Sequence, residues 1–460
     1  MIPSLPRSAV RGITSPAIPG QGSAYVLAML CQLEQSQWRS PDEVFAHQRL
    51  QLAALFNHAS RTVPFYGARF KRAGLDRDHE ITADTVRRIP ILTRADLQDA
   101  VDAIRTRALP RRHGKTHHIQ TSGSTGRPVR VRGTSVTELF WRAFVLREIA
   151  WHKRDLSGKL AAIRYRKKGE AMAPDGLHLD RWPPPVGAVY ETGPSAFLNI
   201  ASDTNAQVQW LVRENPDYLV SYPSNLVALA AICVKKGHRL SQLRQVVTVG
   251  ETVTDAMRKT IRDAWGVPST DSYTCEETGY LALQCPDHEH YHVQSENVYL
   301  EVVDDDGDPC RPGDVGRVLV TGLHNFATPL IRYELGDYAE VGEACPCGRG
   351  LPVIKRILGR RRNRLILPNG ESQFPYLGEY EDFQAITTSV LEFQYVQHSL
   401  EEVEKKMVVS EPLTTEQEEK IRALIIKSLG YPFRITLSYH DKIPRSPRGK
   451  FEEFICEVAR

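Results

Sequence analysis

The sequence predicts an α/β protein with a large N-terminal domain and a small, mobile α+β lid at the C-terminus. Between residues 160 and 265, short apolar runs alternate with segments of helical periodicity. This pattern is typical of a mostly parallel sheet covered by helices. From Val298 onward the period changes to two, which indicates a hairpin-rich β section. A chain of 460 residues is also too long for one compact core, so at least two domains are expected.

Composition places the chain among ordinary globular proteins. Hydrophobic residues make up 41% and charged residues 25% of the chain, which is enough for a core without a disordered composition. The net charge of +4 is spread along the sequence and argues against a nucleic-acid binder. No apolar run is long enough to cross a bilayer, and the run Ala24–Leu30 lacks a clear signal-cleavage site. We therefore expect a cytoplasmic protein that binds neither nucleic acid nor membrane.

Helices are expected in the N-terminal portion, about residues 25–115. The first twenty residues are rich in Pro, Ser and Gly and predict a loose arm. The segment Gln48–His58 places its apolar residues on one broad face at helical spacing. Thr93 is expected to cap another helix. Residues 137–151 repeat apolar side chains at three and four, which predicts a further helix.

The stretch Gln120–Val129 contains six small or hydroxylated residues in a row, Thr121 to Gly126. Glycines allow backbone N–H groups to approach an anion, and the hydroxyls add donors, so the stretch predicts a phosphate cradle. It is not a Walker loop, because no Gly-Lys follows and residues 129–132 alternate like a strand. The alternative interpretation is a solvated hairpin turn.

Strands are predicted at residues 161–163, 218–221 and 245–249, with helices at 224–236 and 256–265. Ligands of parallel sheets collect at the carboxyl ends of the strands. The segments Gly250–Thr252 and Tyr273–Cys275 are expected at that edge.

Four motifs, taken in chain order, resemble the signature of the adenylate-forming enzymes, which include acyl-coenzyme A ligases, peptide-synthetase adenylation domains and luciferases. They are the Thr121–Gly126 loop, Tyr273–Gly279, Arg332–Asp337 and Ile443–Lys450. The chain is most similar to the phenylacetate–coenzyme A ligase branch and to its capsule-biosynthesis-type relatives, from about Gln48 to the C-terminus. The resemblance implies a large domain over residues 1–358 and a lid over residues 359–460.

The resemblance also implies a role for each motif residue. The loop would hold the β- and γ-phosphates of ATP, and Glu277 would ligate Mg²⁺. Asp337 would accept hydrogen bonds from both ribose hydroxyls. Lys450 would bring a positive charge to the reacting oxygens when the lid closes. Lys450, Glu277 and Thr125 form the implied catalytic set. The implied nucleotide-binding set is Ser122, Gly123, Ser124, Thr125, Gly126, Gly250, Glu251, Thr252, Tyr273, Thr274, Asp337, Arg360 and Lys450.

The activity implied is that of an ATP-dependent, AMP-forming ligase for a small aromatic carboxylic acid, with a thiol acceptor and coenzyme A as first choice. Departures from the family pattern leave the acceptor open. Glu276 replaces the usual hydroxylated residue, residues 361–363 replace the acids after the hinge, and Leu365–Gly370 replaces a glycine-containing loop. The alternatives are a nitrogen nucleophile and a catalytically silent binding homologue. A carrier protein and a second copy of the chain are possible partners.

A separate group of residues predicts a structural zinc site. Cys345 and Cys347 lie one residue apart, and Cys285 precedes three histidines at 288, 290 and 292. Three thiolates and one imidazole satisfy a closed tetrahedral site, and we expect His292 to be the fourth ligand. The alternative is buried, unligated cysteines. Eight cysteines in a chain of this size form no disulfide framework.

Overall fold

The computed structural model describes residues 4–75, 80–120, 128–360, 363–375, 377, 380–446 and 449–458. The chain divides into two compact units, and each is made of several segments. The first unit comprises Met1–Gly158, Leu179–Ser195 and Asp271–Ile357, and the second comprises Lys159–His178, Ala196–Thr270 and Leu358–Arg460.

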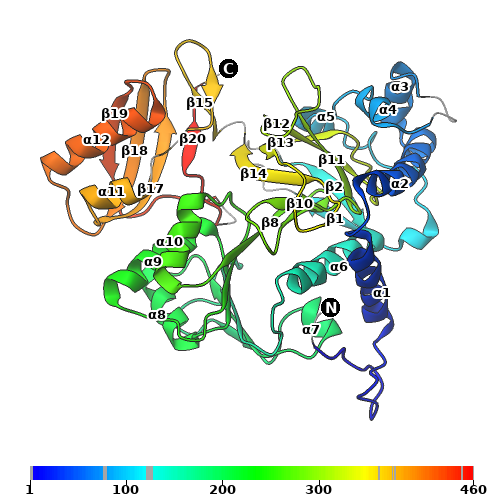
Figure 1. The fold of residues 1–460 in the computed structure, drawn as a ribbon, viewed down its shortest axis with the longest axis horizontal. Helices are drawn as coiled ribbons and strands as arrows, with labels where there is room; N and C mark the ends of the chain where they lie inside the picture. The colour runs from blue at the N-terminus through cyan, green and yellow to red at the C-terminus, as the bar shows by residue number, and fades with distance from the viewer. Residues whose placement is uncertain are drawn as a thin grey trace. The chain divides into compact units, whose positions relative to one another are not determined.

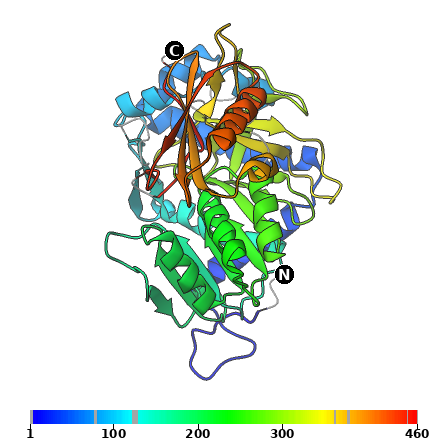
Figure 2. The same ribbon diagram turned by 90° about the vertical axis from the view of Figure 1, so that its left-hand side faces the viewer.

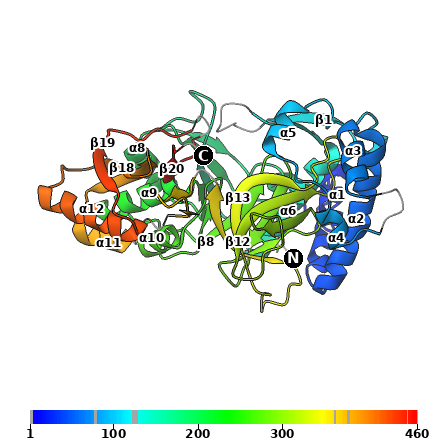
Figure 3. The same ribbon diagram turned by 90° about the horizontal axis from the view of Figure 1, so that it is seen from above.

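Helices make up the N-terminal part of the first unit, and Figure 3 shows α1 to α4 gathered at one end of it. The α2 helix begins where Ser40 accepts a hydrogen bond from the Glu43 N–H and Pro41 occupies the first position. Thr93 caps α5 as predicted. The helices are α1 (Gln21–Ser36), α2 (Pro41–Thr62), α3 (Pro64–Arg72), α4 (Ala83–Arg87), α5 (Arg94–Asp99), the 3₁₀ turn η1 (Arg111–His113), α6 (Ser135–Trp151) and α7 (Val186–Val189).

The strands of the first unit are mainly antiparallel. A hairpin pairs β1 (Thr116–Gln120) with β2 (Arg130–Thr134). The other strands are β8 (Ser269–Cys275), β9 (Gly279–Gln284), β10 (Tyr291–Val293), β11 (Val298–Val303), β12 (Val315–Gly322), β13 (Tyr333–Val341) and β14 (Val353–Arg360). Their order is β11-β12-β13-β14-β10-β9-β8. The pairs β8–β9, β9–β10, β10–β14, β11–β12 and β12–β13 are antiparallel.

A fully buried arginine ties α1 and α6 to this sheet. Arg147 of α6 donates to the Leu33 carbonyl at 2.8 Å and to Gln294 Oε1 at 2.8 Å. Both oxygens of Glu296 accept from the same guanidinium at 3.0 Å, and Ser36 donates to that carboxylate at 2.5 Å. Burial alone would raise the pKa of Glu296, but the Arg147 charge and these donors hold it below its usual value.

The second unit contains the parallel strands. Its order is β7-β6-β3-β5-β4, and the pairs β3–β6 and β6–β7 are parallel. These strands are β3 (Leu160–Arg164), β4 (Leu177–Leu179), β5 (Ser195–Asn199), β6 (Tyr218–Ser221) and β7 (Gln245–Thr248). The helices are α8 (Thr204–Glu214), α9 (Pro223–Lys236) and α10 (Asp255–Trp265), which lie side by side in Figure 1.

The C-terminal segment of the second unit has its own core. A four-stranded sheet in the order β19-β18-β17-β20 carries α12 on one face (Figure 2). Phe383, Tyr395, Ile421 and Phe433 are among the buried residues between them. The elements are β15 (Leu365–Ile366), β16 (Ser372–Gln373), α11 (Tyr380–Ile386), β17 (Val390–Gln397), β18 (Glu402–Val409), α12 (Thr415–Leu429), β19 (Arg434–Tyr439) and β20 (Phe454–Cys456).

The predicted α/β class is confirmed. The strands and helices expected between residues 160 and 265 are present, although β4, β5 and α8 were not predicted. In the β section, antiparallel pairing is already present at β8–β9, before the expected Val298. The reason is that Tyr280 to Gln284 of β9 are all buried, so this strand shows no alternation in the sequence. The division at residue 358 stays a prediction, because residues 358–460 group with 159–178 and 196–270. No helix among the described residues is long and apolar enough to span a membrane.

Candidate active site

A strand lies on each side of the predicted phosphate loop, and β2 falls where residues 129–132 were expected to alternate like a strand. Thr116 pairs with Thr134 and Gln120 with Arg130, so the chain reverses between β1 and β2. The loop residues Ser122, Gly123, Ser124, Thr125 and Gly126 lie outside the described residues. Their role in holding phosphate stays a prediction.

Two predicted nucleotide-binding residues meet in the first unit. The hydroxyl of Tyr273, on β8, donates to Asp337 Oδ2, on β13, at 2.8 Å. Tyr273 is buried, with 8% of its surface exposed. A hydrogen bond from a buried phenol fixes the orientation of the carboxylate, which then presents its oxygens in a defined plane. Thr274 follows Tyr273 on β8.

Glu277 lies in the short turn between β8 and β9 and is 9% exposed. Its neighbourhood is negatively charged. Burial, together with the nearby carboxylates of Glu277 and Asp337, raises the pKa of the Cys275 thiol to about 12. Two acids this close to one buried thiol favour a cation beside them, and carboxylate oxygens are the ligands that Mg²⁺ prefers.

Gly250 and Lys450 come together in the second unit. Gly250 follows β7 and has a φ of +79°, a conformation that favours glycine. A Cβ at this position would lie 3.2 Å from the Tyr222 ring and 3.4 Å from Lys450 Cε. The lysine side chain therefore passes directly over the backbone at the carboxyl end of β7. Lys450 is itself exposed.

Glu251 faces a set of hydrogen-bond donors. Ser224 donates to Glu251 Oε2 from its backbone at 3.1 Å and from its hydroxyl at 2.7 Å. The Phe451 N–H donates to Oε1 at 2.5 Å, and Arg445 Nη1 lies 3.8 Å from the same oxygen. Burial raises the pKa of Glu251 above its usual value, although these donors and the Arg445 charge act in the opposite direction.

Thr252 and the predicted hinge are neighbours in the second unit. A Cβ on Gly359 would lie 3.5 Å from Thr252 Oγ1. Gly359 and Arg360 belong to the end of β14, and the Arg360 N–H donates to Asn363 Oδ1 at 3.1 Å. The neighbouring residues 361 and 362 lie outside the described part of the chain.

The predicted site residues thus form two groups. Tyr273, Thr274, Glu277 and Asp337 belong to the first unit, and Gly250, Glu251, Thr252, Arg360 and Lys450 belong to the second. Sequence reasoning missed Ser224 and Arg445, which face Glu251. The only signal for Arg445 was its place in the Ile443–Lys450 motif.

The four predicted zinc ligands converge in the first unit. Cys285 follows β9, His292 lies on β10, and Cys345 and Cys347 precede β14. Their ligand atoms all lie within 4.8 Å of one another. Cys285 Sγ is 3.8 Å from Cys345 Sγ, and Cys347 Sγ is 3.4 Å from His292 Nε2. A tetrahedral zinc ion with Zn–S distances of about 2.3 Å would place sulfur atoms about 3.8 Å apart, so the cluster fits this ion.

The surroundings of the cluster orient the His292 ring and shift the pKa values of all four side chains. His292 Nδ1 lies 3.4 Å from the Leu351 carbonyl, which directs Nε2 toward the thiols. Burial lowers the pKa of His292 to about 4, so the imidazole is neutral. Burial raises the pKa of Cys285, and that of Cys345 to about 12. For Cys347 burial acts in the same direction, but donors from Arg349 bring its pKa below the usual value.

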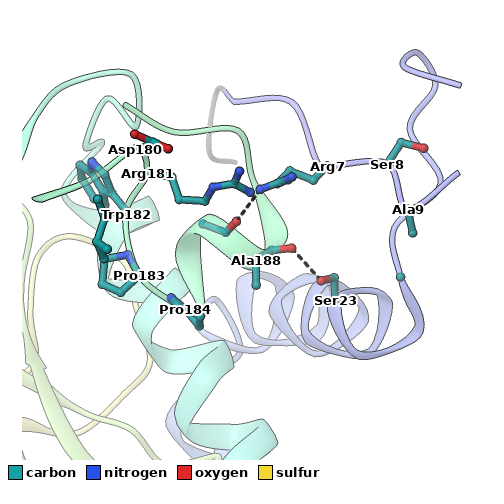
Figure 4. Close-up of a pocket in the computed structure, with 13 residues that line it drawn as sticks. Arg7, Ser8, Ala9, Ser23, Asp180, Arg181, Trp182, Pro183, Pro184 and Ala188 are labelled. Carbon is teal, nitrogen blue, oxygen red and sulfur yellow. Dashed lines mark hydrogen bonds between the residues drawn. The ribbon is translucent and has the colours of Figure 1, made fainter. Parts of the chain in front are cut away.

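A surface pocket of about 590 Å³ lies in the first unit, away from all of these residues (Figure 4). It forms where the N-terminal arm crosses the segment before α7. Arg7 donates to the Gly187 carbonyl at 3.3 Å, and Ser23 donates to the Ala188 carbonyl at 3.0 Å. None of the predicted site residues lines this pocket.

Two segments of the chain match known family models. Residues 187–328 match the AMP-binding enzyme family, and residues 380–457 match the CapK C-terminal domain. The first match contains β5 to β12 and α8 to α10, and the second contains the four-stranded sheet with α11 and α12.

Similarity to individual proteins extends over most of the chain. It is 28% identical over 443 residues to a phenylacetate–coenzyme A ligase of Thermus thermophilus, covering 90% of this chain and 96% of that protein. It is 22% identical over 447 residues to Protein CapK of Staphylococcus aureus, covering 91% and 90% of the two chains. The structure of 2-hydroxyisobutyryl-CoA ligase superposes with a TM-score of 0.71 at 18% identity and 92% coverage of each chain. At this identity the superposition shows a shared fold.

Proposed function

We propose that this chain, which belongs to the adenylate-forming, AMP-binding enzymes, activates a small aromatic carboxylic acid and passes it to coenzyme A. It is an ATP-dependent, AMP-forming ligase. The acid and the acceptor are the proposed part. Both follow the phenylacetate–coenzyme A ligases to which the chain is similar.

The observation that carries the proposal is the position of Lys450 against Gly250 at the carboxyl end of β7. Parallel sheets bind their ligands at this edge of the strands. A lysine brought to this edge from the C-terminal segment can place its ammonium group on an anionic substrate. The exposure of Lys450 is compatible with that role, because the group must reach a bound ligand.

In the proposed reaction a carboxylate oxygen of the acid attacks the α-phosphorus of ATP. The bond between the α-phosphorus and the bridging oxygen breaks, and pyrophosphate leaves with the electron pair. Lys450 stabilises the negative charge that develops on the transferred phosphoryl group. The loop Ser122 to Gly126, which includes Thr125, would hold the β- and γ-phosphates.

The acids of the first unit have separate proposed roles. Asp337, oriented by Tyr273, would accept the ribose hydroxyls. Glu277 would hold Mg²⁺, which neutralises phosphate charge when it is bound. Gly250 and Thr252, with Thr274 and Arg360, would complete the nucleotide site.

The acceptor is proposed from the similar ligases and from the segment that follows the hinge. Leu365–Gly370 contains β15 and the start of the turn of the β15–β16 hairpin, where the ligases resembled by the sequence carry a glycine-containing loop. We keep coenzyme A as acceptor because that is what the names of the similar ligases specify. A carrier-protein thiol or a nitrogen nucleophile is the alternative.

The experiment that tests the proposal is ATP–pyrophosphate exchange with a panel of aryl and short-chain acids, followed by product analysis with and without coenzyme A. An acid-dependent exchange, with acyl-coenzyme A detected by mass spectrometry, is the expected outcome. An adenylate that coenzyme A leaves intact but an amine consumes would change the acceptor. Absence of exchange with every acid would favour a silent homologue.

We also propose that residues 359–460 act as a lid that moves about Gly359 between the two half-reactions. The match of residues 380–457 to a separate C-terminal domain family supports this division. A cytoplasmic location is proposed because the reaction depends on ATP and the cysteines form no disulfide. A carrier protein or a homodimer partner would be recognised in pull-down and light-scattering measurements.

A structural zinc ion bound by Cys285, His292, Cys345 and Cys347 is the last part of the proposal. The tetrahedral spacing of the ligand atoms supports it. Such a closed site would join β9, β10 and the segment before β14 without taking part in the reaction. Metal analysis of the purified protein should give one zinc per chain, and a protein free of zinc would remove this site.

A further inference from the structure

A buried carboxylate in the second unit binds the chain on both sides of Lys450. Glu251 has 5% of its side chain exposed. It accepts from the N–H of Phe451, one residue after the lysine, and lies 3.8 Å from Arg445, five residues before it. Two attachment points this close in sequence restrict the position of Lys450, which directly precedes Phe451.

Arg445 extends this arrangement to two further elements. Its Nη1 donates to the Ser224 hydroxyl, at the start of α9, at 2.9 Å. Its Nη2 donates to Glu392 Oε1, on β17, at 2.7 Å. The guanidinium also lies 5.1 Å from the centre of the Phe451 ring. A planar guanidinium with fixed donors suits such a bridge better than an ammonium group would.

Local contacts hold the backbone of Lys450 as well. The Lys450 N–H donates to Ser446 Oγ at 3.0 Å, and the Ser446 N–H donates to the Lys450 carbonyl at 2.8 Å. Gly449 has a φ of +78° and lies against Ile200, where a Cβ would be only 2.7 Å from a methyl carbon. These two hydrogen bonds and the packing of Gly449 therefore fix the backbone position of Lys450.

We propose that Glu251 and Arg445 are positioning residues that fix Lys450 for adenylation, an inference that rests on the proposed role of Lys450. We call the contacts of Glu251 with Ser224, Arg445 and Phe451 the clasp. The Glu251 carboxylate already faces three sets of donors, so its role is to hold the lysine segment. A lysine displaced by about 1 Å can cost two orders of magnitude in rate. A lid that moves between the two half-reactions must release the clasp. The clasp therefore affects adenylation and not the transfer step.

The test compares Arg445→Gln, Arg445→Lys and Glu251→Gln with a matched control, Arg434→Gln. Arg434 lies on β19 of the same C-terminal sheet and pairs with Glu402 at 3.0 Å, but its side chain is 74% exposed. The first measurement is hydrogen exchange of the Phe451 amide by mass spectrometry. We expect exchange about tenfold faster in Arg445→Gln and Glu251→Gln than in the wild type or the control, because the carboxylate acceptor is lost or released.

The second measurement separates the half-reactions. Arg445→Gln should lower kcat of pyrophosphate exchange by about 10- to 100-fold, with KM for ATP changed less than about threefold. Transfer from chemically prepared acyl-AMP to the acceptor should proceed at the wild-type rate. Arg445→Lys should recover part of the loss, and Arg434→Gln should resemble the wild type.

Several outcomes would overturn the inference. If the Phe451 amide exchanges hydrogen at the wild-type rate in Arg445→Gln and Glu251→Gln, the clasp does not exist in solution, whatever the adenylation activity of these variants. A loss of both half-reactions in equal measure would make the contacts structural. A wild-type rate of pyrophosphate exchange in Arg445→Gln, alongside an inactive Lys450→Ala, would remove the positioning role and leave the proposed function intact. A wild-type protein without pyrophosphate-exchange activity would reject both the proposed function and the positioning role.

Discussion

The cysteine cluster and the clasp are both buried polar groups, but the chain builds them in different ways. The cluster gathers four ligand atoms from β9, β10 and the segment before β14. The clasp joins Ser224 to Arg445, which are 221 residues apart. Neighbouring strands bring the cluster together as soon as the sheet forms, whereas the clasp needs a C-terminal segment to dock. The cluster is therefore suited to stability, and the clasp to a step that has to be reversible.

Replacing Lys450 by Ala is expected to have the largest effect on the clasp side of this comparison. The ammonium group would be lost from the transition state, so the rate of pyrophosphate exchange should fall about 1,000-fold. ATP affinity, measured by titration calorimetry, should remain within a few-fold of the wild type. The melting temperature should not change, because Lys450 is exposed. An undiminished exchange rate would remove Lys450 from the mechanism.

Replacing Cys347 by Ser should show the opposite behaviour. Loss of one thiolate weakens zinc binding, and metal-binding free energy adds to folding free energy. We expect a loss of about 2–4 kcal/mol in stability, seen as a lower melting temperature in a thermal scan with and without a chelator. Pyrophosphate exchange below the melting temperature should be unaffected. Cys31→Ser is the matched control, because Cys31 is exposed on α1.

Glu453 lies close to the clasp, and its titration makes the folding stability of the protein depend on pH. Burial raises the pKa of Glu453 to about 7, and the neighbouring Glu251 charge adds to this shift. A raised pKa means that the folded chain holds a proton that the unfolded chain has lost, so stability falls as pH rises from about 4.5 to 7. Glu453→Gln should match the wild type in melting temperature at pH 4.5. At pH 8 it should be more stable by about 2 kcal/mol. A larger difference at the lower pH would contradict the shift.

Replacing Tyr273 by Phe should have the smallest effect of the four. It removes the hydrogen bond to Asp337 and leaves the ring in the core. We expect KM for ATP to rise about threefold to tenfold, equivalent to about 1 kcal/mol, with kcat nearly unchanged. Tyr338→Phe on β13 is a control that leaves the Asp337 contact in place. A change in kcat alone would mean that Asp337 acts on the reaction and not on nucleotide binding.

The comparison also explains what the sequence could reveal. Cys345 and Cys347 were predicted to be zinc ligands because their residue type and spacing are chemically specific. The structure places His292, the histidine preferred among the three, beside the thiols, and zinc binding by this group stays a prediction. Helix starts such as that of α5 depend on a few adjacent residues, so Thr93 was identified as its cap. These features are local or belong to neighbouring strands.

Features that depend on distant packing were missed. Ser224 and Arg445 are ordinary polar residues in the sequence, and nothing in their spacing links them to Glu251. The α8 helix was missed although Asp203 caps it and Val208, Leu211 and Val212 lie at helical spacing, so a local signal for this helix was present in the sequence. The meeting of Tyr273 with Asp337 was expected only through the family resemblance, since the two strands are separated by β9 to β12 along the chain.

The buried Arg147 has a consequence for shortened forms of the protein. The guanidinium depends on the Leu33 carbonyl, and its partner Glu296 depends on Ser36. A chain shortened to begin after Ser36 would keep the arginine in the interior but take away part of its solvation shell. Glu296 and Gln294 would still accept from Arg147, so the expected cost is that of a lost hydrogen bond to a charged group, about 1.5–3 kcal/mol. The helix α1 therefore supplies polar partners to a buried ion pair beside the sheet. Shortened forms should keep this helix, and fusion partners should be attached ahead of Gln21.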